Sequence, residues 1–563
     1  MLKFSSGQSG HTGHEESRLS KLYVRLATPI LRTRKGALRF LLLVGGATIL
    51  SCSLFYFDLV KVKLLPFDNK SELDVVLNLP PGATLEDTER TLFAAARVAG
   101  QMPEVTSMQA YAGTSAPFDF NGLVRQYFNR SSPELGELHI VLVNKDDRKR
   151  QSHDIAVALR RALDGQIPLP PGGVIKVVEV PPGPPVLATL LAEIYGPTEA
   201  VRHAQAEKVK AVFKSIPFIV DVDDSYGLPP PRLQITVDQD DLEYYGVTQA
   251  DVNDTIRELF DGTGIGYSYR GADHPPLEIA VGLPKTGLTW NDAIASTPVP
   301  ANALPGARGV VELGDLVTAR QVTGSPAIFR RDGHFADMVT AELAGKFEAP
   351  IYGMFAVDDA LKAANWGGMQ KPDIRFFSQP TDETKPSLLW DGEWQITFVT
   401  FRDMGIAFGV AILGIYVLVV GLFRSFKLPL VVLTPIPLTL IGIMFGHLVL
   451  GADFTATSMI GFIALAGIIV RNSILLVDFI RHRQHDDRAL REVLLEAGAI
   501  RAKPILLTAL AAMISASTIL SDPIFQGLAT SLLFGLASST LLTLLVIPAI
   551  YVVLRDDGRP LAK

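Results

Sequence analysis

The sequence predicts a membrane α-helical bundle of six spans joined to a large α+β domain of ferredoxin-like βαβ sandwiches. The chain has 563 residues, of which 48% are hydrophobic and 20% charged, a balance between that of a soluble protein and that of a pure membrane bundle. Six mostly apolar stretches reach the roughly 20 residues that a bilayer requires. Residues 60–395, between the first and second stretches, are far too many for a loop and must fold.

The spans and their flanking charges predict an orientation. The six spans cover residues 38–57, 404–423, 428–450, 457–480, 504–520 and 527–554. Lysine and arginine gather before the first span, after the second, fourth and sixth, and are absent from the turns 451–456 and 521–526. The positive-inside rule therefore places both termini in the cytoplasm and residues 60–395 outside. The start is a signal anchor rather than a cleaved signal peptide, because its charged leader is long and no A-x-A site follows.

The order of predicted elements divides the chain into seven regions. They are a basic cytoplasmic leader (1–37), the first span (38–58), porter-like βαβ subdomains (59–245), an inserted docking-like module (246–324), a segment that completes the last subdomain (325–400), spans two to six (401–554) and a cytoplasmic tail (555–563). Repeated strand–helix–strand patterns such as SELDVVLNL, LEDTERTLFAAARVAG and VTSMQAYAG predict the sandwiches. The segment LLWDGEWQITFVTF before the second span is an interfacial entry segment or packs beneath the outer domain.

Several functional classes lack support. The formal net charge of −6 argues against nucleic-acid binding, and a single cysteine excludes a disulfide framework. The chain has no Walker A loop and no nucleophile–base motif, so we expect no enzyme. Energy for any transport would come from an ion gradient, without a cofactor.

Three segments carry a family resemblance. FRSFKLPLVVLTPIPLTLIG (423–442), GFIALAGIIVRNSILLVDF (461–479) and EAGAIRAKPILLTAL (496–510) occur in order and at the expected spacing. Together they resemble the second half of a resistance–nodulation–division (RND) efflux transporter, an acriflavine-resistance-like inner-membrane permease. The resemblance implies a bacterial inner-membrane protein with a periplasmic domain, in a trimeric assembly with a periplasmic adaptor and an outer-membrane channel. It also implies a first-half subunit that supplies an Asp-Asp pair.

Arg471 is the most informative residue of the fourth span. A charge at this depth costs from ~3 to more than 10 kcal/mol, so it needs a polar partner. Asp478 lies on the same helix face but roughly 10 Å of rise away, so most of the counter-charge must come from another segment. Arginine cannot release its proton and would act as a fixed cation beside the acid pair. The alternative is a static ion pair between helix bundles.

By resemblance, Arg471 and Asn472 fall where the family has a Lys–Asn pair of the proton relay, and Thr508 and Arg501 fall on its eleventh span. The alternative for Thr508 is back-bonding to a carbonyl one turn earlier. Arg501 is otherwise a topology charge, and Asp478 a hydrated carboxylate at the cytoplasmic end.

Candidate substrate contacts lie in the segment between the first two βαβ units: Phe118, Phe120, Tyr127 and Phe128. The alternative for these aromatic side chains is packing in the core. No methionine occurs between Met108 and Met338, which favours organic substrates over soft metal ions bound by thioethers, and no metal site is predicted. The expected function is proton-driven export of small hydrophobic or amphiphilic compounds, as in multidrug efflux. The alternatives are a heavy-metal or lipid exporter of the same family, or a truncated membrane protein inactive without its first half.

Overall fold

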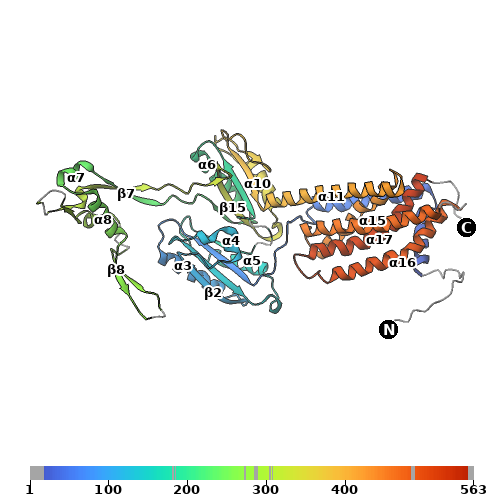
Figure 1. Ribbon diagram of the computed structural model, residues 1–563, viewed down its shortest axis with the longest axis horizontal. Helices are drawn as coiled ribbons and strands as arrows, with labels where there is room; N and C mark the ends of the chain where they lie inside the picture. The colour runs from blue at the N-terminus through green and yellow to red at the C-terminus, as the bar shows by residue number, and fades with distance from the viewer. Residues whose placement is uncertain are drawn as a thin grey trace. The chain divides into compact units, whose positions relative to one another are not determined.

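The computed structural model describes residues 18–180, 183, 186–271, 274–284, 289–302, 306, 309–483 and 488–555. Residues 1–17 of the predicted leader and 556–563 of the predicted tail therefore lie outside the described part. The chain forms two compact units (Figure 1). One consists of Tyr226–Ile328 with the short stretch Pro80–Ala83, and the other contains the remaining outer elements and the membrane helices.

The described residues include six helices that are long and apolar enough to cross a membrane, as predicted. They are α2 (Arg34–Tyr56), α11 (Glu393–Phe423), the run Leu428–Leu450, α15 (Ala456–Arg483), α16 (Leu490–Ser517) and α17 (Gln526–Arg555). The third run is divided into α12 (Leu428–Leu433), α13 (Pro435–Leu438) and α14 (Leu440–Leu450). Two prolines within it, Pro435 and Pro437, lack the N–H groups that would continue a helix.

Two of these helices begin more than ten residues before the predicted spans. The helix α11 begins at Glu393 rather than at residue 404, and α16 begins at Leu490, so Pro504 lies inside it. Both extensions contain polar residues, which a hydropathy window leaves out although they continue the helix. A further helix, α1 (Arg18–Leu31), precedes the first span.

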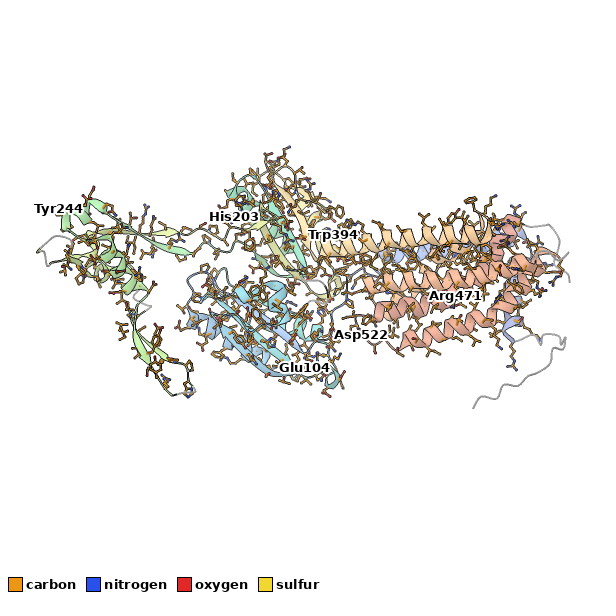
Figure 2. The ribbon with its side chains drawn as sticks, in the orientation of Figure 1. Glu104, His203, Tyr244, Trp394, Arg471 and Asp522 are labelled. Atoms are coloured by element: carbon orange, nitrogen blue, oxygen red, sulfur yellow. The ribbon has the colours of Figure 1, made fainter. Side chains whose placement is uncertain are left out.

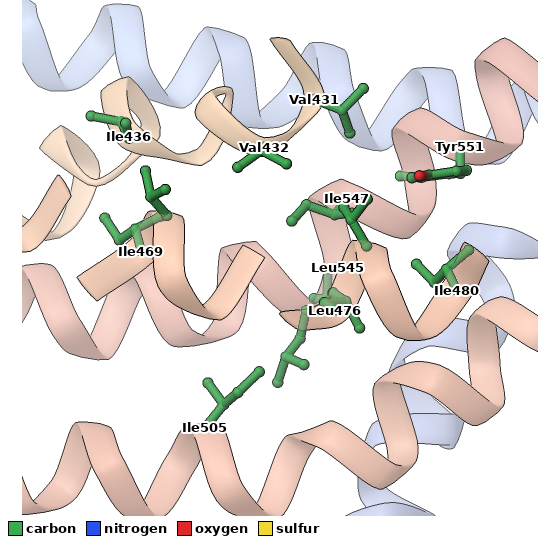
Figure 3. Close-up of a cluster of buried hydrophobic side chains, with 14 of the residues drawn as sticks. Val431, Val432, Ile436, Ile469, Leu476, Ile480, Ile505, Leu545, Ile547 and Tyr551 are labelled. Carbon is green, nitrogen blue, oxygen red and sulfur yellow. The ribbon is translucent and has the colours of Figure 1, made fainter. Parts of the chain in front are cut away.

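The membrane bundle is built around α17. Its buried residues pack with those of neighbouring helices in one apolar cluster that includes Ile469, Leu476 and Ile547 (Figure 3). Glycine allows the closest approaches: a Cβ on Gly446 of α14 would lie 2.5 Å from the ring of Phe534. A glycine of α15, Gly461, faces α17 in the same way, with Ser531 Cβ 2.8 Å from its added Cβ.

The first outer subdomain contains both predicted strand–helix–strand units. Its elements are β1 (Glu72–Asn78), α3 (Leu85–Ala99), β2 (Val105–Ala112), α4 (Phe120–Arg125), β3 (Leu135–Leu142), α5 (Ser152–Leu163) and β4 (Val174–Val178). The four strands form an antiparallel sheet in the order β2-β3-β1-β4. Alternation along β1 directs Leu73, Val75 and Leu77 to the buried face, so Asp74 lies on the opposite face.

The second outer subdomain is a five-stranded sheet in the order β16-β17-β5-β15-β6. Its elements are β5 (Leu190–Tyr195), α6 (Glu199–Ser215), β6 (Ile219–Asp224), β15 (Asp337–Leu343), α10 (Pro350–Ala363), β16 (Asp373–Arg375) and β17 (Ser387–Gly392). The segment LLWDGEWQITFVTF supplies β17 and the start of α11. Its two tryptophans are buried, and Trp390 stacks on Phe213 with ring centroids 6.0 Å apart. Packing in the outer domain, rather than an interfacial position, therefore accounts for them.

The passage from β17 to α11 has no intervening loop. Gly392 ends the strand and Glu393 begins the helix. Gly392 has a φ of 72°, and an added Cβ would lie 2.7 Å from the carbonyl oxygen of Ala188. Glycine is required at this junction for both reasons.

The other compact unit begins at Tyr226 rather than at residue 246 as predicted. The reason is that β7 (Pro231–Val237) pairs along its whole length with β12 (Val317–Thr323). Between these strands lie α7 (Gln239–Tyr245), α8 (Gln249–Phe260), the hairpin β8 (Thr263–Ser268) and β9 (Leu277–Val281), and the short pair β10 (Pro298–Ala301) and β11 (Gly309–Glu312). A small core of its own, including Leu242, Val252 and Leu313, holds the unit together.

Candidate functional site

Arg471 lies on α15, well inside the length of the membrane helices (Figure 2). Its side chain is exposed, and it shares a stripe with three other exposed residues, Ala464, Gly467 and Leu475. Among the described residues, none forms an ion pair or hydrogen bond with its guanidinium. Within the described part of the chain, Arg471 is therefore a cation without a counter-charge on the outer face of the bundle, beside a strip of small residues.

The small residues of α15 lie on two different faces of the helix. No atom of the described residues lies within 4 Å of a Cβ added to Gly467, so this glycine borders open space in that part of the chain. Gly461, by contrast, is buried against α17. The open face thus consists of Ala464, Gly467 and Arg471 without Gly461.

The other predicted relay residues are distributed along α15 and α16. Asn472 is buried next to Arg471. Thr508 is exposed, and its hydroxyl donates a hydrogen bond to the carbonyl of Ile505 at 2.9 Å. This is the alternative given above for Thr508, a bond to the backbone of its own helix. Asp478 is half-exposed, and its carboxylate lies 3.4 Å from His482 one turn on. No hydrogen bond within the described part of the chain joins these residues into one network.

Arg501 packs against α15. Its guanidinium carbon lies 5.5 Å from the centroid of the Phe479 ring, and no described residue forms a hydrogen bond with its buried Nε. A cation–π contact of this kind attaches α16 to the end of α15 next to Asp478. The relay role of Arg501 thus remains a prediction.

The four predicted substrate contacts lie around α4. Three of them, Phe118, Phe120 and Phe128, are exposed, so core packing is wrong for these side chains. Phe118 and Phe128 contact each other with ring centroids 5.9 Å apart, and the Arg130 guanidinium covers Tyr127 at 5.5 Å. A patch of aromatic surface is therefore available on the first outer subdomain.

Hydrogen bonds and one ion pair fix the segment that carries this patch. Asp119 caps α4 by accepting a hydrogen bond from the backbone N–H of Gly122 at 2.5 Å. At the end of the helix, Arg125 forms a buried ion pair with Glu342 of β15 at 2.7 Å. The phenylalanines are thus presented on a segment bonded to both outer sheets.

A group of metal-ligating side chains, missed by the sequence analysis, lies beside this segment. Donor atoms of Asp74, Asp119 and His139 all lie within 4.8 Å of one another. The His139 Nδ1 is 2.7 Å from Asp74 and 3.9 Å from Asp119. The amide nitrogen of Asn121 donates to Asp74 at 2.5 Å, while its buried Oδ1 has no hydrogen-bond partner among the residues that the structure describes.

The electrostatics of this group follow from hydrogen bonding and burial. The hydrogen bond that the His139 imidazole donates to Asp74 raises the pKa of His139, and burial raises the pKa of Asp119. Burial also raises the pKa of Glu137, which lies two residues from His139 on the same face of β3. Carboxylates held close together in this way favour a bound cation or proton. Two carboxylates and an imidazole are also ligands for divalent ions such as Zn²⁺.

A second charged cluster joins the two outer subdomains. His153 of α5 contacts Glu179 through Nδ1 and Glu348 through Nε2, both at 2.9 Å. Glu348 also pairs with Lys63 at 3.5 Å, and the backbone N–H of Lys63 donates to Phe454, between α14 and α15. Burial lowers the pKa of His153, but the hydrogen bonds that its imidazolium donates to the two glutamates outweigh this effect and raise the pKa to about 9. The cluster links the chain leaving α2 to both sheets.

A six-helix membrane bundle with this outer domain is that of an RND efflux permease. The sequence profile of the AcrB/AcrD/AcrF family matches residues 10–352 and 385–555, and the chain belongs to this family. Membership in this family and the six apolar helices indicate an inner-membrane protein.

Curated relatives carry different names. The cobalt-zinc-cadmium resistance protein CzcA of Cupriavidus metallidurans is 26% identical over 374 residues, 65% of this chain and 33% of that protein. The swarming motility protein SwrC of Bacillus subtilis is 23% identical over 96% of this chain and 48% of that protein. The multidrug resistance protein MdtC of Erwinia amylovora is 22% identical over 61% of this chain and 32% of that protein.

A solved structure shares the fold. The crystal structure of a heavy metal efflux pump (crystal form II) has a TM-score of 0.75 at 19% identity, over 95% of this chain and 52% of that one. This chain thus spans a third to a half of the length of the proteins that it matches.

Proposed function

We propose that this chain is the second half of an RND efflux permease driven by the proton gradient, and that it works only with a first half that supplies an acidic pair. The observation that carries the proposal is Arg471, a cation on an exposed stripe of small residues along a membrane helix. Such a charge is costly in hydrocarbon unless it is paired. Because Gly467 borders open space, another helix has room to approach closely.

In this proposal, carboxylates of the first half neutralise Arg471. Protonation of one carboxylate weakens that ion pair and allows the helices to shift, while Arg471 keeps its own proton. Asn472 and Thr508 would supply hydrogen bonds after Thr508 exchanges its backbone partner, with Arg501 and Asp478 at the end of the path.

The same proposal includes topology and assembly. Both termini are cytoplasmic and the outer units periplasmic, supported by the distribution of lysine and arginine. We assign the first outer subdomain to the ferredoxin-like class because its βαββαβ order gives the strand order β2-β3-β1-β4. A trimer with a periplasmic adaptor and an outer-membrane channel completes the pump.

The first candidate cargo is a small hydrophobic or amphiphilic compound. The exposed phenylalanines Phe118, Phe120 and Phe128 support it, because aromatic surface with one cation–π pair nearby suits amphiphiles. The resistance protein MdtC bears the word multidrug in its name.

The second candidate cargo is a divalent metal cation, favoured by the Asp74–Asp119–His139 group. Its oxygen and nitrogen donors suit borderline ions rather than Cu(I), which agrees with the missing thioethers. The cobalt-zinc-cadmium resistance protein CzcA and the nickel and cobalt resistance protein CnrA are relatives at 26% and 28% identity.

One experiment tests the function and separates the cargoes. Cells expressing this chain with a first-half subunit are compared for tolerance to amphiphilic dyes and to Zn²⁺, Co²⁺ and Cd²⁺. Phe118→Ser/Phe128→Ser should abolish dye tolerance alone if the cargo is organic, and Asp74→Asn/His139→Gln should abolish metal tolerance alone if it is a cation. Tolerance conferred equally by Arg471→Ala would contradict the efflux mechanism itself.

A further inference from the structure

A groove of about 310 Å³ lies between α1 and the membrane helices α16 and α17. Leucines line most of it, with contributions from alanine and methionine. Only two of its lining side chains carry a polar atom, and both are satisfied by main-chain carbonyls: Tyr23 donates to Leu544 at 3.1 Å, and Thr540 donates to Leu536 at 2.7 Å. The groove therefore suits a hydrocarbon chain rather than a polar ligand.

The helix α1 is fixed on the bundle by one of its faces. Tyr23, Ala27 and Leu31 are buried, and the Tyr23 ring occupies the space beside Gly498 where any larger residue of α16 would place its Cβ. A second stripe lines the groove, yet its side chains keep much of their surface: Leu19 is 38%, Leu22 53% and Leu26 49% exposed. Apolar surface is thus left uncovered in the described chain.

A basic stripe borders these leucines. Arg18, Lys21 and Arg25 are exposed, and their spacing of three and four residues places them along one side of α1. At about 100° per residue this side adjoins the leucine stripe and lies opposite the buried face. Residues 18–39 contain further lysines and arginines and neither aspartate nor glutamate.

Apolar and basic stripes together match one kind of molecule. Amphipathic helices with a basic face bind membrane surfaces that contain anionic lipids, and basic clusters next to a membrane span attract their headgroups. We propose that α1 and the groove form a binding site for an anionic phospholipid. Its phosphate lies on Arg18, Lys21 and Arg25, and one acyl chain fills the groove against Leu22, Leu510 and Leu541. This site is independent of the cargo and of Arg471.

The test uses the purified full chain in a neutral detergent. Mixed micelles containing phosphatidylglycerol should raise its unfolding temperature by several degrees more than micelles containing phosphatidylcholine. The variant Arg18→Gln/Lys21→Gln/Arg25→Gln should lose this difference. A matched control, Lys145→Gln/Lys149→Gln/Arg161→Gln, removes three exposed charges from the outer region and should keep it. Raising the salt concentration should reduce the difference in the wild type.

A second measurement locates the acyl chain. The substitution Leu22→Trp places a fluorophore in the groove, and phosphatidylglycerol brominated on its acyl chains should quench it more than brominated phosphatidylcholine does at equal mole fraction. Excess unbrominated phosphatidylglycerol should restore the signal. Equal quenching by both lipids, or a stabilisation that survives in the Arg18/Lys21/Arg25 variant, would overturn the proposal. The proposal would also be wrong if the fluorophore became less accessible to the brominated lipids as the protein concentration rises. A second copy of the chain would then occupy the groove.

Discussion

The carboxylate of Asp74 on β1 lies 2.7 Å from the imidazole Nδ1 of His139 on β3, and the two residues are direct partners in the antiparallel register. This hydrogen bond raises the pKa of His139, so the imidazole keeps its proton to higher pH than an isolated histidine does. A protonated imidazole cannot bind a metal ion.

If the group binds a divalent cation, the affinity of the full chain for Zn²⁺ should rise with pH as His139 loses its proton. Asp74→Asn should weaken binding by at least about tenfold and move the pH midpoint lower, because the charge that holds the proton is removed. Calorimetric titrations between pH 6 and 9 measure both effects. Asp146→Asn, which removes an exposed carboxylate from the same subdomain, is the control. Identical titrations of wild type and Asp74→Asn would rule out this site.

Arg471→Ala, expressed with a first-half subunit, should abolish export while membrane abundance stays near normal, because the residue has no partner within the described chain to lose. Arg471→Lys keeps the charge and should retain part of the activity. Accumulation of a fluorescent substrate or of metal in cells measures export. Arg402→Ala removes an exposed cation near the start of α11 and should leave export unchanged. If the Arg471→Ala strain tolerated the exported compound as well as wild type does, the relay mechanism would be wrong.

The His153 cluster should make stability depend on alkaline pH. The pKa of His153 is raised to about 9 in the folded chain, above its ordinary value. A raised pKa stabilises the fold fully below the unfolded pKa, and this contribution is lost as pH rises through about 9. We expect a loss on the order of 3 kcal/mol or less between pH 6 and 10.

Thermal unfolding of wild type and His153→Gln across this range provides the comparison. The variant should be less stable than wild type at pH 6 and should differ little from it at pH 10. The His153 ring stacks on Phe67 with ring centroids 4.4 Å apart. If the difference in stability between wild type and variant were the same at every pH, the imidazolium charge would contribute nothing beyond this packing.

Two glycines form a matched pair of substitutions. Gly446→Ala should destabilise the chain by about 1–3 kcal/mol, because the new Cβ would lie 2.5 Å from the Phe534 ring. Gly467→Ala should leave the unfolding temperature of this chain unchanged, since no described atom lies within 4 Å of the added carbon. If another helix packs on that stripe, Gly467→Ala should still reduce co-purification of the first half. Unchanged co-purification would place the partner elsewhere.

Hydropathy predicted the six membrane helices because apolar length is a local property of the sequence. It misplaced the starts of α11 and α16, where polar residues continue the helix outside the apolar window. The strand–helix–strand units were also predictable from periodicity. The boundary at residue 246 differed from the structure because β7 pairs with β12, more than 70 residues further along, and no local pattern encodes that pairing.

For the candidate sites too, the sequence reveals individual residues but not the contacts that the fold creates. Arg471 is evident as a charge within an apolar run, but the side of α15 that faces the bundle depends on packing with α17. Asp74 and His139 lie 65 positions apart and meet only through the β1–β3 register. The alternation of Asp74 with buried apolar residues was the available signal, since a carboxylate in the middle of a buried strand calls for a partner.

The loopless passage at Gly392 has a mechanical consequence. With 31 residues, α11 is about 46 Å long, and it continues directly from a strand inside the five-stranded sheet. A tilt of about 5° around the glycine would sweep the far end of the helix through roughly 4 Å, by the rigid-rod geometry of a helix that long. Strand and helix are thus joined at a single residue, so a rotation of the five-stranded sheet would pass to α11 with no loop in between to absorb it.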